Sequence, residues 1–279
     1  MTDNKADDWF APIPSGKEPV EIDTSVAHPA RVYDYWLGGK DNYAADRDAA
    51  EHVISIRPTI LRDIRANRAF LGRAVAYLAS EPRIRQFLDI GTGIPASPNV
   101  HEIVQKIAAE SRVVYVDNDP IVHAHARALL ASAPEGATAY IEADLRESST
   151  ILSEAARTLD LTRPVAVVLV GILHLISDKE GPYGIVARLM DTVPSGSYLV
   201  ISHPASDIHA EAVAEGARRY NQSVATAQTR RSFAEVSRFF DGLDIVPPGV
   251  VQCHRWWPAP EEADADYEVS GWAGVGRKP

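Results

Sequence analysis

Residues 86–98 read QFLDIGTGIPASP, an apolar run that passes directly into two closely spaced glycines and two prolines. A short apolar run bounded by turn residues is typical of a buried strand. The glycines let the next piece of backbone turn tightly and pass close to a ligand. Ser97 and Pro98 suit the start of a helix, as N-cap and first helical residue. We therefore expect a strand, a glycine turn and a helix whose free N–H groups face a ligand.

Further apolar runs follow this strand and alternate with segments of helical periodicity, which is the pattern of parallel βαβ units. Runs such as VAVVLV are apolar throughout, so we expect helices on both faces of the sheet. Strands are predicted at 86–90, 112–117, 137–143, 164–172 and 197–203, with weaker signals at LDIV (243–246) and YEVSGWAGVG (267–276). Helices are predicted between and after them, at about 98–109, 120–130, 149–159, 181–192, 207–222 and 232–240.

Three helical patterns precede the first strand, and Pro or Gly bounds each of them. They cover residues 29–37, 44–56 and 58–79, and the third carries an apolar stripe along several turns. Residues 1–27 are rich in Asp, Lys, Pro and Ser and show no periodicity, so we interpret them as a mobile arm. The chain is expected to divide into an arm (1–27), a helical lid (28–80) and an α/β domain (81–279).

The composition excludes several classes of protein. The chain has 279 residues, of which 46% are hydrophobic and 24% charged, as in an ordinary globular protein. A net charge of −10 argues against a nucleic-acid or anionic membrane partner. No apolar run reaches the length of a membrane span, and the amino terminus has no leader pattern. The single cysteine, Cys253, excludes an internal disulfide and a zinc site built on CxxC pairs. We expect a cytoplasmic protein without a metal ion.

Polar residues and glycines follow four successive strands. In an open parallel sheet a ligand lies beyond the carboxyl ends of the strands, where the strand order reverses. Asp117 ends the second strand 24 residues after Gly93, where an acidic side chain can accept hydrogen bonds from both hydroxyls of a ribose. The strand ends together suit one nucleoside-containing ligand, and their residues are Asp89, Gly91, Thr92, Gly93, Asp117, Asp144, Leu145, Gly171, Ile172 and His174.

The glycine turn alone does not identify this ligand. GTGIPA satisfies the GxGxxG/A pattern of dinucleotide sites, so an NAD-dependent oxidoreductase is one alternative. Asp89, two residues before the first glycine, would repel the diphosphate of a dinucleotide but suits a ligand that carries an ammonium group. S-adenosylmethionine has a ribose, an adenine and an ammonium group and no phosphate. A P-loop is excluded, because GxxxxGK followed by Ser or Thr does not occur.

Four separated segments, FLDIGTG, VVYVDNDP, EADLRE and VVLVGILHLISD, resemble motifs I to IV of class I S-adenosylmethionine-dependent methyltransferases in order and spacing. Four others, ARVYDYWLGGKDNYAADRDAA, NRAFLGRAV, GIPASPNVHEI and GWAGVGRKP, are similar to a bacterial S-adenosyl methyltransferase family. The resemblance covers residues from about Pro29 to the carboxyl end. It implies a Rossmann-like α/β fold with a seven-stranded, mostly parallel sheet, whose last strand, near YEVSGWAGVG, runs antiparallel.

The resemblance also implies a role for each matching residue. Asp89 would lie at the methionine ammonium group, Gly91, Thr92 and Gly93 under the methionine and ribose, and Asp117 at the ribose hydroxyls. Asn118 would lie near the adenine, Asp144 would accept a hydrogen bond from the adenine amino group, and the Leu145 backbone would contact the ring. Gly171 and Ile172 would line the site beneath the transferred methyl, and a lid over the cofactor would include Arg31, Tyr33, Asn42 and Tyr43.

Methyl transfer is an in-line displacement in which a sulfonium loses its charge. The protein therefore has to align the reactants, exclude water and deprotonate the acceptor where needed. His174 and His203 follow the fourth and fifth strands and are the candidate general bases, although a histidine there can also be a hydrogen-bonded structural residue. The aromatic faces of Tyr33, Trp36 and Tyr43 either stabilise the sulfonium or belong to the core.

Two classes of function remain besides the oxidoreductase. The first is an enzyme that methylates a small molecule in a pocket closed by the amino-terminal helices and by QCHRWWP (252–258). Trp256 and Trp257 would favour a flat or apolar acceptor, or else lie in the core. The second is a protein that binds S-adenosylmethionine without catalysis. The arginine pairs at 218–219 and 230–231 are interpreted as solvated helix faces rather than contacts to an acidic acceptor or nucleic acid. A homodimer is an alternative to a monomer.

Overall fold

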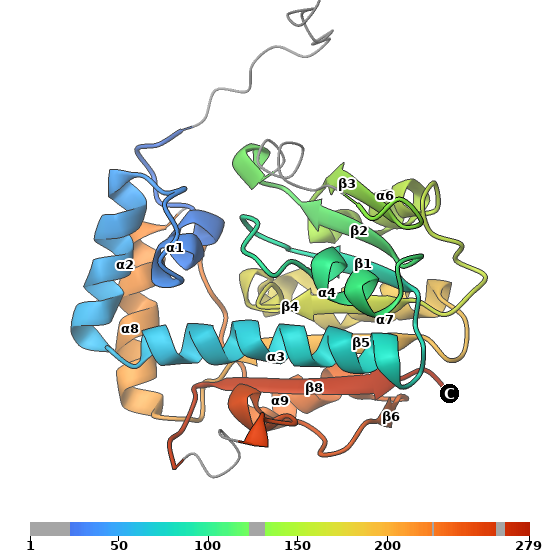
Figure 1. The fold of residues 1–279 in the computed structure, drawn as a ribbon. Helices are drawn as coiled ribbons and strands as arrows, with labels where there is room; N and C mark the ends of the chain where they lie inside the picture. Colours follow the sequence, from blue (N-terminus) through green and yellow to red (C-terminus); the bar gives the residue numbers. More distant parts are fainter. Residues whose placement is uncertain (1–22, 123–131, 225, 261–265) are drawn as a thin grey trace, which may run out of the picture.

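The computed structural model describes residues 23–122, 132–224, 226–260 and 266–279 (Figure 1). Most of the predicted arm (1–27) and most of the helix predicted at 120–130 lie outside the described residues. The described part of the chain forms a central sheet, helices on both of its faces and a further group of helices at one end of the sheet (Figure 1).

The sheet has the strand order β3-β2-β1-β4-β5-β8-β6, with β1 to β5 parallel. The order reverses between β1 and β4, which is where an open α/β sheet forms a ligand crevice. β8 is antiparallel and lies between β5 and β6, so the prediction of a Rossmann-like fold with an antiparallel last strand is confirmed. The strands are β1 Gln86–Ile90, β2 Arg112–Asp117, β3 Ala137–Glu142, β4 Ala166–Val170, β5 Tyr198–Pro204, β6 Asp244–Ile245, β7 Val251–Gln252 and β8 Gly271–Arg277.

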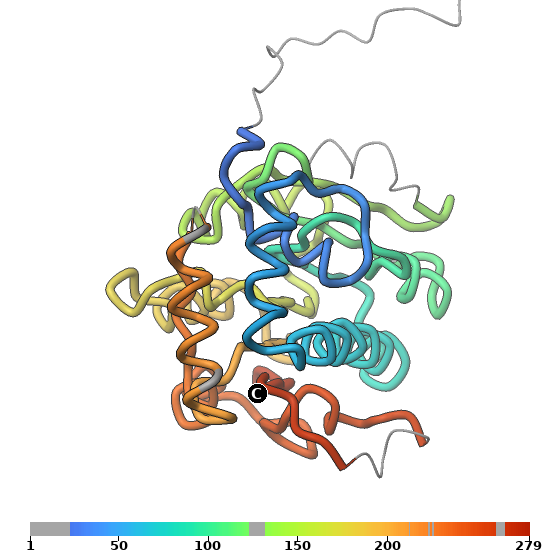
Figure 2. Tube along the Cα trace, turned by 90° about the vertical axis from the view of Figure 1, so that its left-hand side faces the viewer, coloured from blue at the N-terminus to red at the C-terminus, as the bar shows by residue number. Residues whose placement is uncertain are grey.

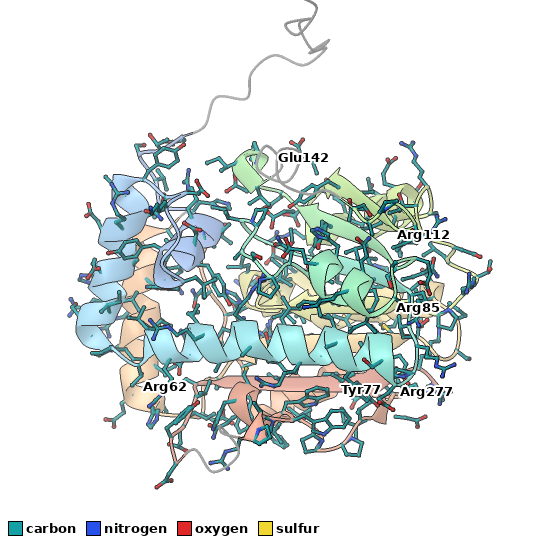
Figure 3. All side chains as sticks on the ribbon, in the orientation of Figure 1. Arg62, Tyr77, Arg85, Arg112, Glu142 and Arg277 are labelled. Atoms are coloured by element: carbon teal, nitrogen blue, oxygen red, sulfur yellow. The ribbon has the colours of Figure 1, made fainter. Side chains whose placement is uncertain are left out.

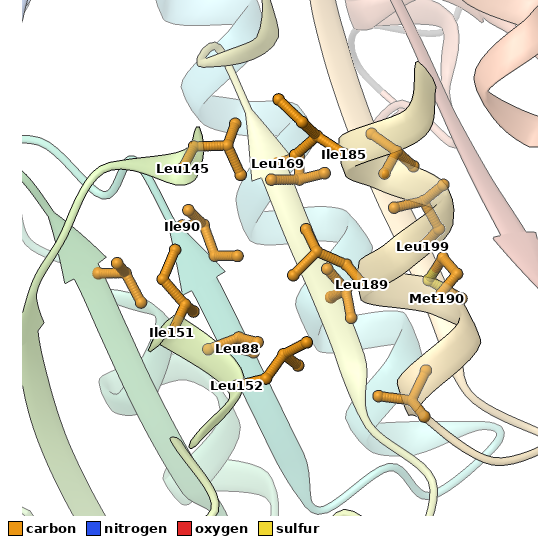
Figure 4. Packing of buried hydrophobic residues seen from close by; sticks show 14 of the residues in the cluster. Leu88, Ile90, Leu145, Ile151, Leu152, Leu169, Ile185, Leu189, Met190 and Leu199 are labelled. Carbon is orange, nitrogen blue, oxygen red and sulfur yellow. The ribbon is translucent and has the colours of Figure 1, made fainter. Parts of the chain in front are cut away.

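The residues of β1 illustrate how the strands serve two cores. Phe87 packs with α3 (Ile60–Ser80) and α4 (Val100–Ile107), whereas Leu88 and Ile90 pack with α6 (Ser148–Ala155) and α7 (Pro182–Thr192). Figure 4 shows the second of these two clusters. Successive residues of a strand point to opposite faces, so a sheet covered on both faces favours apolar residues at consecutive positions. The helices that cover both faces of the sheet therefore explain the continuous apolar runs in the sequence.

A third apolar cluster joins helices from two distant parts of the chain. α1 (Pro29–Trp36) and α2 (Ala44–Ile56) contribute Val32, Trp36 and Val53, and α8 (Ala210–Ser223) contributes Tyr220. Figures 1 and 2 show α2 and α8 side by side at the end of the sheet. We call α1, α2 and α8 the cap. The cap differs from the lid predicted over 28–80, because α3 packs mainly on the sheet and α8 comes from later in the chain.

The helix after the glycine turn begins later than predicted. Its N-cap is Asn99 and not Ser97, so α4 begins at Val100. The Asn99 backbone N–H donates to Glu102 at 2.7 Å as part of a capping box, and Ser97 Oγ donates to the same carboxylate at 3.0 Å. Asn99 is the better N-cap because Glu102, three positions later, completes the capping box.

The carboxyl-terminal third adds elements too short to give a periodic signal. β7 pairs with β8 and is an eighth strand in the described sheet, where seven were predicted. The segment predicted as one helix at 232–240 is α9 (Phe233–Ser237) followed by a 3₁₀ turn. The 3₁₀ turns are Leu145–Glu147, Leu173–Leu175, Asp178–Glu180, Arg238–Phe240 and Cys253–Arg255.

Replacing Leu169 by Ala is expected to lower the free energy of unfolding by about 2–5 kcal/mol, because the change leaves a cavity in the core. Leu169 is fully buried in β4 among the residues of Figure 4. Urea denaturation measures the loss. Ile107→Ala is the matched control, because this side chain is exposed at the end of α4 and its truncation changes stability by only about 0.5 kcal/mol. Equal losses in the two variants would contradict the core position of Leu169.

Candidate active site

A cavity of about 260 Å³ lies beyond the carboxyl ends of β1, β2, β4 and β5. Arg85 and Arg112, at the starts of β1 and β2, lie at the end of the sheet away from the cap, so the carboxyl ends face the cap (Figure 3). The structure brings all the residues of the predicted cofactor and base sets to this cavity, namely Tyr33, Asp89, Gly91, Thr92, Gly93, Asp117, Asn118, Asp144, Leu145, Gly171, Ile172, His174 and His203.

The glycine turn is closely packed against the loop after β4. Gly91 has a φ of +75°, and a Cβ added there would come within 2.5 Å of the Ile172 side chain. Its backbone N–H donates to Val116 at 2.8 Å, which ties the turn to β2. Both the positive φ and the lack of space require glycine at this position. The turn therefore brings bare backbone to the cavity wall.

Asp117 connects the ends of β1 and β2. Its carboxylate accepts hydrogen bonds from the backbone N–H groups of Gly93 at 2.8 Å and of Asp119 at 3.0 Å. Asp119 in turn contacts His28 Nδ1 at 2.8 Å, and His28 is the N-cap of α1. Burial raises the pKa of Asp117, and the two backbone hydrogen bonds oppose this shift. The chain of contacts fixes the start of the cap to the strand ends.

Asp89 is a carboxyl buried at the floor of the cavity. It is 4% exposed, and burial raises its pKa to about 7, although Arg68 and a hydrogen bond from the Thr92 side chain favour ionisation. Asp117 adds a smaller repulsion that raises the pKa further. Near neutral pH this carboxyl therefore accepts or releases a proton readily. A cation placed beside it would stabilise the ionised form.

The ends of β2 and β3 meet through side chains. Asn118 Nδ2 donates to Asp144 Oδ2 at 3.0 Å, and Arg146 Nη1 lies 2.9 Å from each Asp144 oxygen. Arg146 also donates to Glu180 at 2.6 Å. These contacts hold Asn118 and Asp144 in place at the more open side of the cavity.

A hydrogen-bonded row in the cavity wall joins α1, α3 and β5. Asn67 Nδ2 donates to the Tyr33 hydroxyl at 2.8 Å, and Ser202 Oγ donates to Asn67 Oδ1 at 2.5 Å. Burial raises the pKa of Tyr33 to about 12, so its hydroxyl stays neutral. A Cβ on Gly171 would lie 3.3 Å from Asn67 Nδ2. The row is uncharged and borders the backbone of the loop after β4.

The two candidate bases have different surroundings. Because Arg231 Nη1 can only donate, His203 Nε2, 2.8 Å away, is the acceptor, and His203 Nδ1–H is left to donate to Pro204 at 3.0 Å. Burial, with Arg231 and Arg230 nearby, lowers the pKa of His203 to about 3. His174 Nδ1 is closed off from solvent and has no hydrogen-bond partner among the described residues. Burial and the neighbouring His203 hold the pKa of His174 well below its usual range.

Several residues expected near the ligand lie elsewhere. Arg31 forms a buried ion pair with Asp46 inside the cap, and the Asn42 amide donates to Asp34. Tyr43 is 39% exposed, and only Tyr33 and Trp36 of the three aromatic candidates line the cavity. Trp256 is buried against Phe70 and Tyr77, and Trp257 stacks on Trp256. The two tryptophans therefore do not form the pocket wall. Of the segment QCHRWWP, only Cys253 lines the cavity.

Sequence reasoning missed a basic part of the wall. Arg230 lines the cavity and Arg231 is 1% exposed, so the interpretation of the 230–231 pair as a solvated helix face is wrong. The 218–219 pair does lie on the outside of α8, where both arginines contact Glu215. Asn67 and Arg68, within the quoted segment NRAFLGRAV, are further cavity residues without a predicted role. No local pattern distinguishes these polar residues from surface ones.

The described residues contain no group of three or more His, Cys, Asp and Glu side chains arranged to hold a metal ion. In the same ranges no helix has both the length and the apolar composition needed to cross a membrane.

Comparisons with known proteins agree with this geometry. A family model described as S-adenosyl methyltransferase matches residues 15–279. A DUF574 family protein from Streptomyces avermitilis is 49% identical, with a TM-score of 0.90 over 93% of this chain and 100% of its own. A protein from Thermobifida fusca, provisionally described as a methyltransferase, is 37% identical, with a TM-score of 0.82 over 92% of this chain and 96% of its own. No curated protein matches the chain significantly.

The ligand-free protein is expected to lose stability through Asp89 as the pH rises from about 4 to about 7. The folded state keeps the Asp89 proton up to about pH 7, whereas the unfolded chain releases it near pH 3.8. Folding therefore takes up a proton in this window, and stability falls as the pH rises through it. The measurement is the melting temperature of Asp89→Asn minus that of the wild type, and this difference should grow as the pH rises from about 4 to about 7. The other titrating groups are present in both proteins, so their effects cancel in the difference. A constant difference would contradict the raised pKa.

Proposed function

Because the chain belongs to the S-adenosyl methyltransferase family, we propose that its cavity binds S-adenosylmethionine at the acidic strand ends and a small-molecule acceptor beneath the cap. Membership of the family makes the chain an S-adenosylmethionine-dependent methyltransferase. The observation that carries the finer proposal is that Asp89, Asp117 and Asp144, from three strand ends, line one cavity that the cap closes.

The acidic side of the cavity fits S-adenosylmethionine in charge and in shape. Asp89 is a buried carboxyl whose raised pKa shows that burial outweighs the nearby Arg68, and an ammonium group would supply the missing cation. Asp117 offers its carboxylate to ribose hydroxyls, and Gly91 to Gly93 offer backbone without side-chain bulk. When bound, the cofactor supplies an electrophilic methyl group carried on a sulfonium.

We propose the remaining cofactor contacts from the same wall. Asn118 and Asp144 are held against each other at 3.0 Å, at the side where an adenine edge would need a donor and an acceptor. Leu145 lies beside them, and Gly171 and Ile172 border the uncharged row of Tyr33, Asn67 and Ser202. Tyr33 lies at the cavity from the α1 side. These placements put the transferred methyl group near the loop after β4.

His174 is the general base that we propose where the acceptor has to lose a proton. Its ring lines the cavity and is uncharged near neutral pH, so it can accept a proton. Both ring nitrogens of His203 have hydrogen-bond partners, which supports a positioning role for that residue. His203 holds Arg231, which also donates to the carbonyls of Leu173 and Ile176 on either side of His174.

The cavity walls support a small acceptor with an apolar body. The side beneath the cap is lined by Trp36, Val53, Ile60, Ile64, Leu71 and Tyr220. A pocket of about 260 Å³ suits a small molecule rather than a nucleic acid. A cytoplasmic location also stays a proposal, supported by the buried free thiol of Cys253.

The oxidoreductase alternative loses its support. A nicotinamide-dependent enzyme on a Rossmann fold would have no antiparallel last strand, whereas β8 is antiparallel, and the matching family model is of S-adenosyl methyltransferases. Binding without catalysis is likewise not what the family indicates.

Calorimetric titration is expected to show micromolar binding of S-adenosylmethionine and S-adenosylhomocysteine and no binding of NAD. Replacing Asp117 by Ala should weaken binding of S-adenosylhomocysteine by about tenfold or more, because hydrogen bonds to a charged group are lost. The control is Asp241→Ala, which should leave the affinity unchanged. Asp241 is exposed, directly follows the 3₁₀ turn Arg238–Phe240 and does not line the cavity.

Asp117 also supports the glycine turn, so the circular dichroism spectrum and melting temperature of Asp117→Ala accompany the titration. Binding of NAD by the wild type, or full affinity of a folded Asp117→Ala protein for S-adenosylhomocysteine, would contradict the proposed site.

His174→Gln is expected to bind S-adenosylhomocysteine within about twofold of the wild type but to transfer methyl groups roughly 10²–10⁴-fold more slowly to an acceptor that needs deprotonation. Transfer of labelled methyl from S-adenosylmethionine measures the rate across a pH series. His203→Gln should instead lower the melting temperature, since Arg231 loses a buried partner. Unchanged turnover in His174→Gln would remove His174 from the base role.

A further inference from the structure

Arg230 is a half-buried cation in the cavity wall, and two of its donor nitrogens have no hydrogen-bond partner among the described residues. These two atoms, Nε and Nη1, are closed off from solvent. Guanidinium N–H groups that are unpaired and closed off from solvent are strongly destabilising, because they have lost their water and gained nothing in return. Such a group in a cavity wall indicates a ligand that supplies the missing acceptors.

Arg231, the next residue, shows what full pairing looks like. Its guanidinium donates to Asp178 at 2.8 Å, to the carbonyl oxygens of Leu173 and Ile176, and to His203 Nε2. The fold is therefore able to satisfy a buried arginine in this segment and does so one position later. Of the two residues, Arg230 is the one that lines the cavity, and its Nε and Nη1 donors are unused among the described residues.

The surroundings of Arg230 carry a surplus of positive charge. Its electrostatic neighbours are Arg57, Asp63 and Tyr220. Asp63 is already held by Arg57 at 2.6 Å and accepts the Ser270 backbone N–H at 3.3 Å. Burial and the repulsion of Arg57 lower the pKa of Arg230 to about 9, so it remains charged at neutral pH. Two guanidiniums and one carboxylate leave one positive charge to be balanced.

The cofactor's own carboxylate is an unsuitable partner for this charge. Arg68 is the arginine that acts on Asp89 and donates to the carbonyls of Ala96 and Pro98 beside the glycine turn. Arg230 interacts instead with the α2–α3 junction and with α8, on the cap side of the cavity. Gln228 Oε1, also unpaired among the described residues, lines the same side and offers an acceptor for a hydroxyl or amine.

We propose that Arg230 binds a carboxylate of the methyl acceptor, which is therefore a small carboxylic acid with an apolar body. The inference rests on the proposed function and names the substrate class of the same site. A single surplus charge matches one carboxylate rather than a phosphate, and the planar fork of a guanidinium matches its two oxygens. The apolar body lies against Trp36 and Tyr220, whose rings are 6.0 Å apart, and the apolar side chains around them.

The test titrates the protein saturated with S-adenosylhomocysteine with benzoate, 4-hydroxybenzoate and 2-aminobenzoate, each against its uncharged carboxamide. At least one acid should bind about tenfold or more tightly than its amide, as expected for a charge-assisted pair. Arg230→Gln should abolish this preference, and Arg230→Lys should retain part of it. Arg218→Gln, which removes an exposed arginine of α8, is the matched control and should retain the full preference.

Three results would overturn the proposal: equal binding of acids and amides by the wild type, an undiminished preference in Arg230→Gln, or a loss of S-adenosylhomocysteine affinity in that variant. The last result would assign Arg230 to the cofactor's carboxylate. Failure of the wild type to bind S-adenosylhomocysteine would instead refute the proposed function, so the two failures are distinguishable.

A stability measurement separates a ligand-binding Arg230 from a structural one. Arg230→Met should raise the melting temperature of the ligand-free protein, because the variant no longer keeps two unpaired guanidinium nitrogens away from solvent. A structural arginine would give a lower melting temperature in the same variant, and that result would count against the proposal.

Discussion

The carboxylate of Asp117 holds the site together, because it accepts hydrogen bonds from Gly93 and Asp119 and so joins the ends of β1 and β2. Asp119 extends this connection to His28 at the start of α1, so the same group that supports the glycine turn also fixes the cap. Gly91 can approach Ile172 closely only while the turn keeps this geometry. The ligand wall and the closure of the cavity therefore depend on one buried acidic residue.

Much of the fold can be predicted from the sequence, because helices cover both faces of the sheet and the buried strands are apolar. Helices on both faces require continuous apolar runs, and the predicted bounds of β1 and β2 agree with the structure. The positions of Asp89, Asp117, Asp144 and Gly171 at one cavity follow from topology alone, since parallel strands end at the same edge. The start of α4 differs from the prediction, because the capping box of Asn99 and Glu102 replaces Ser97 as the N-cap.

The remaining features depend on contacts between residues far apart in the chain. α8 joins α1 and α2 in the cap, and its amphipathic pattern does not say which helices it meets. The doublet of Arg230 and Arg231 reads as surface charge, because a local pattern gives no sign that Asp178 and three other acceptors surround Arg231. Trp256 is buried against Phe70 of α3, and the exposed Trp257 stacks on it, so neither lines the pocket.

Acidic and basic residues from different elements line the cavity, and this arrangement affects His174, the proposed base. Asp89 and Asp117 line it at the strand ends, Arg57 and Arg230 line it near α3 and α8, and the uncharged Tyr33–Asn67–Ser202 row also borders it. In the proposed arrangement the sulfonium and the carboxylate each lie next to side chains of opposite charge. Arg230 is among the cations that depress the pKa of His174. A carboxylate on Arg230 would offset that effect, raise the basicity of His174 and so couple binding of the acceptor to its deprotonation.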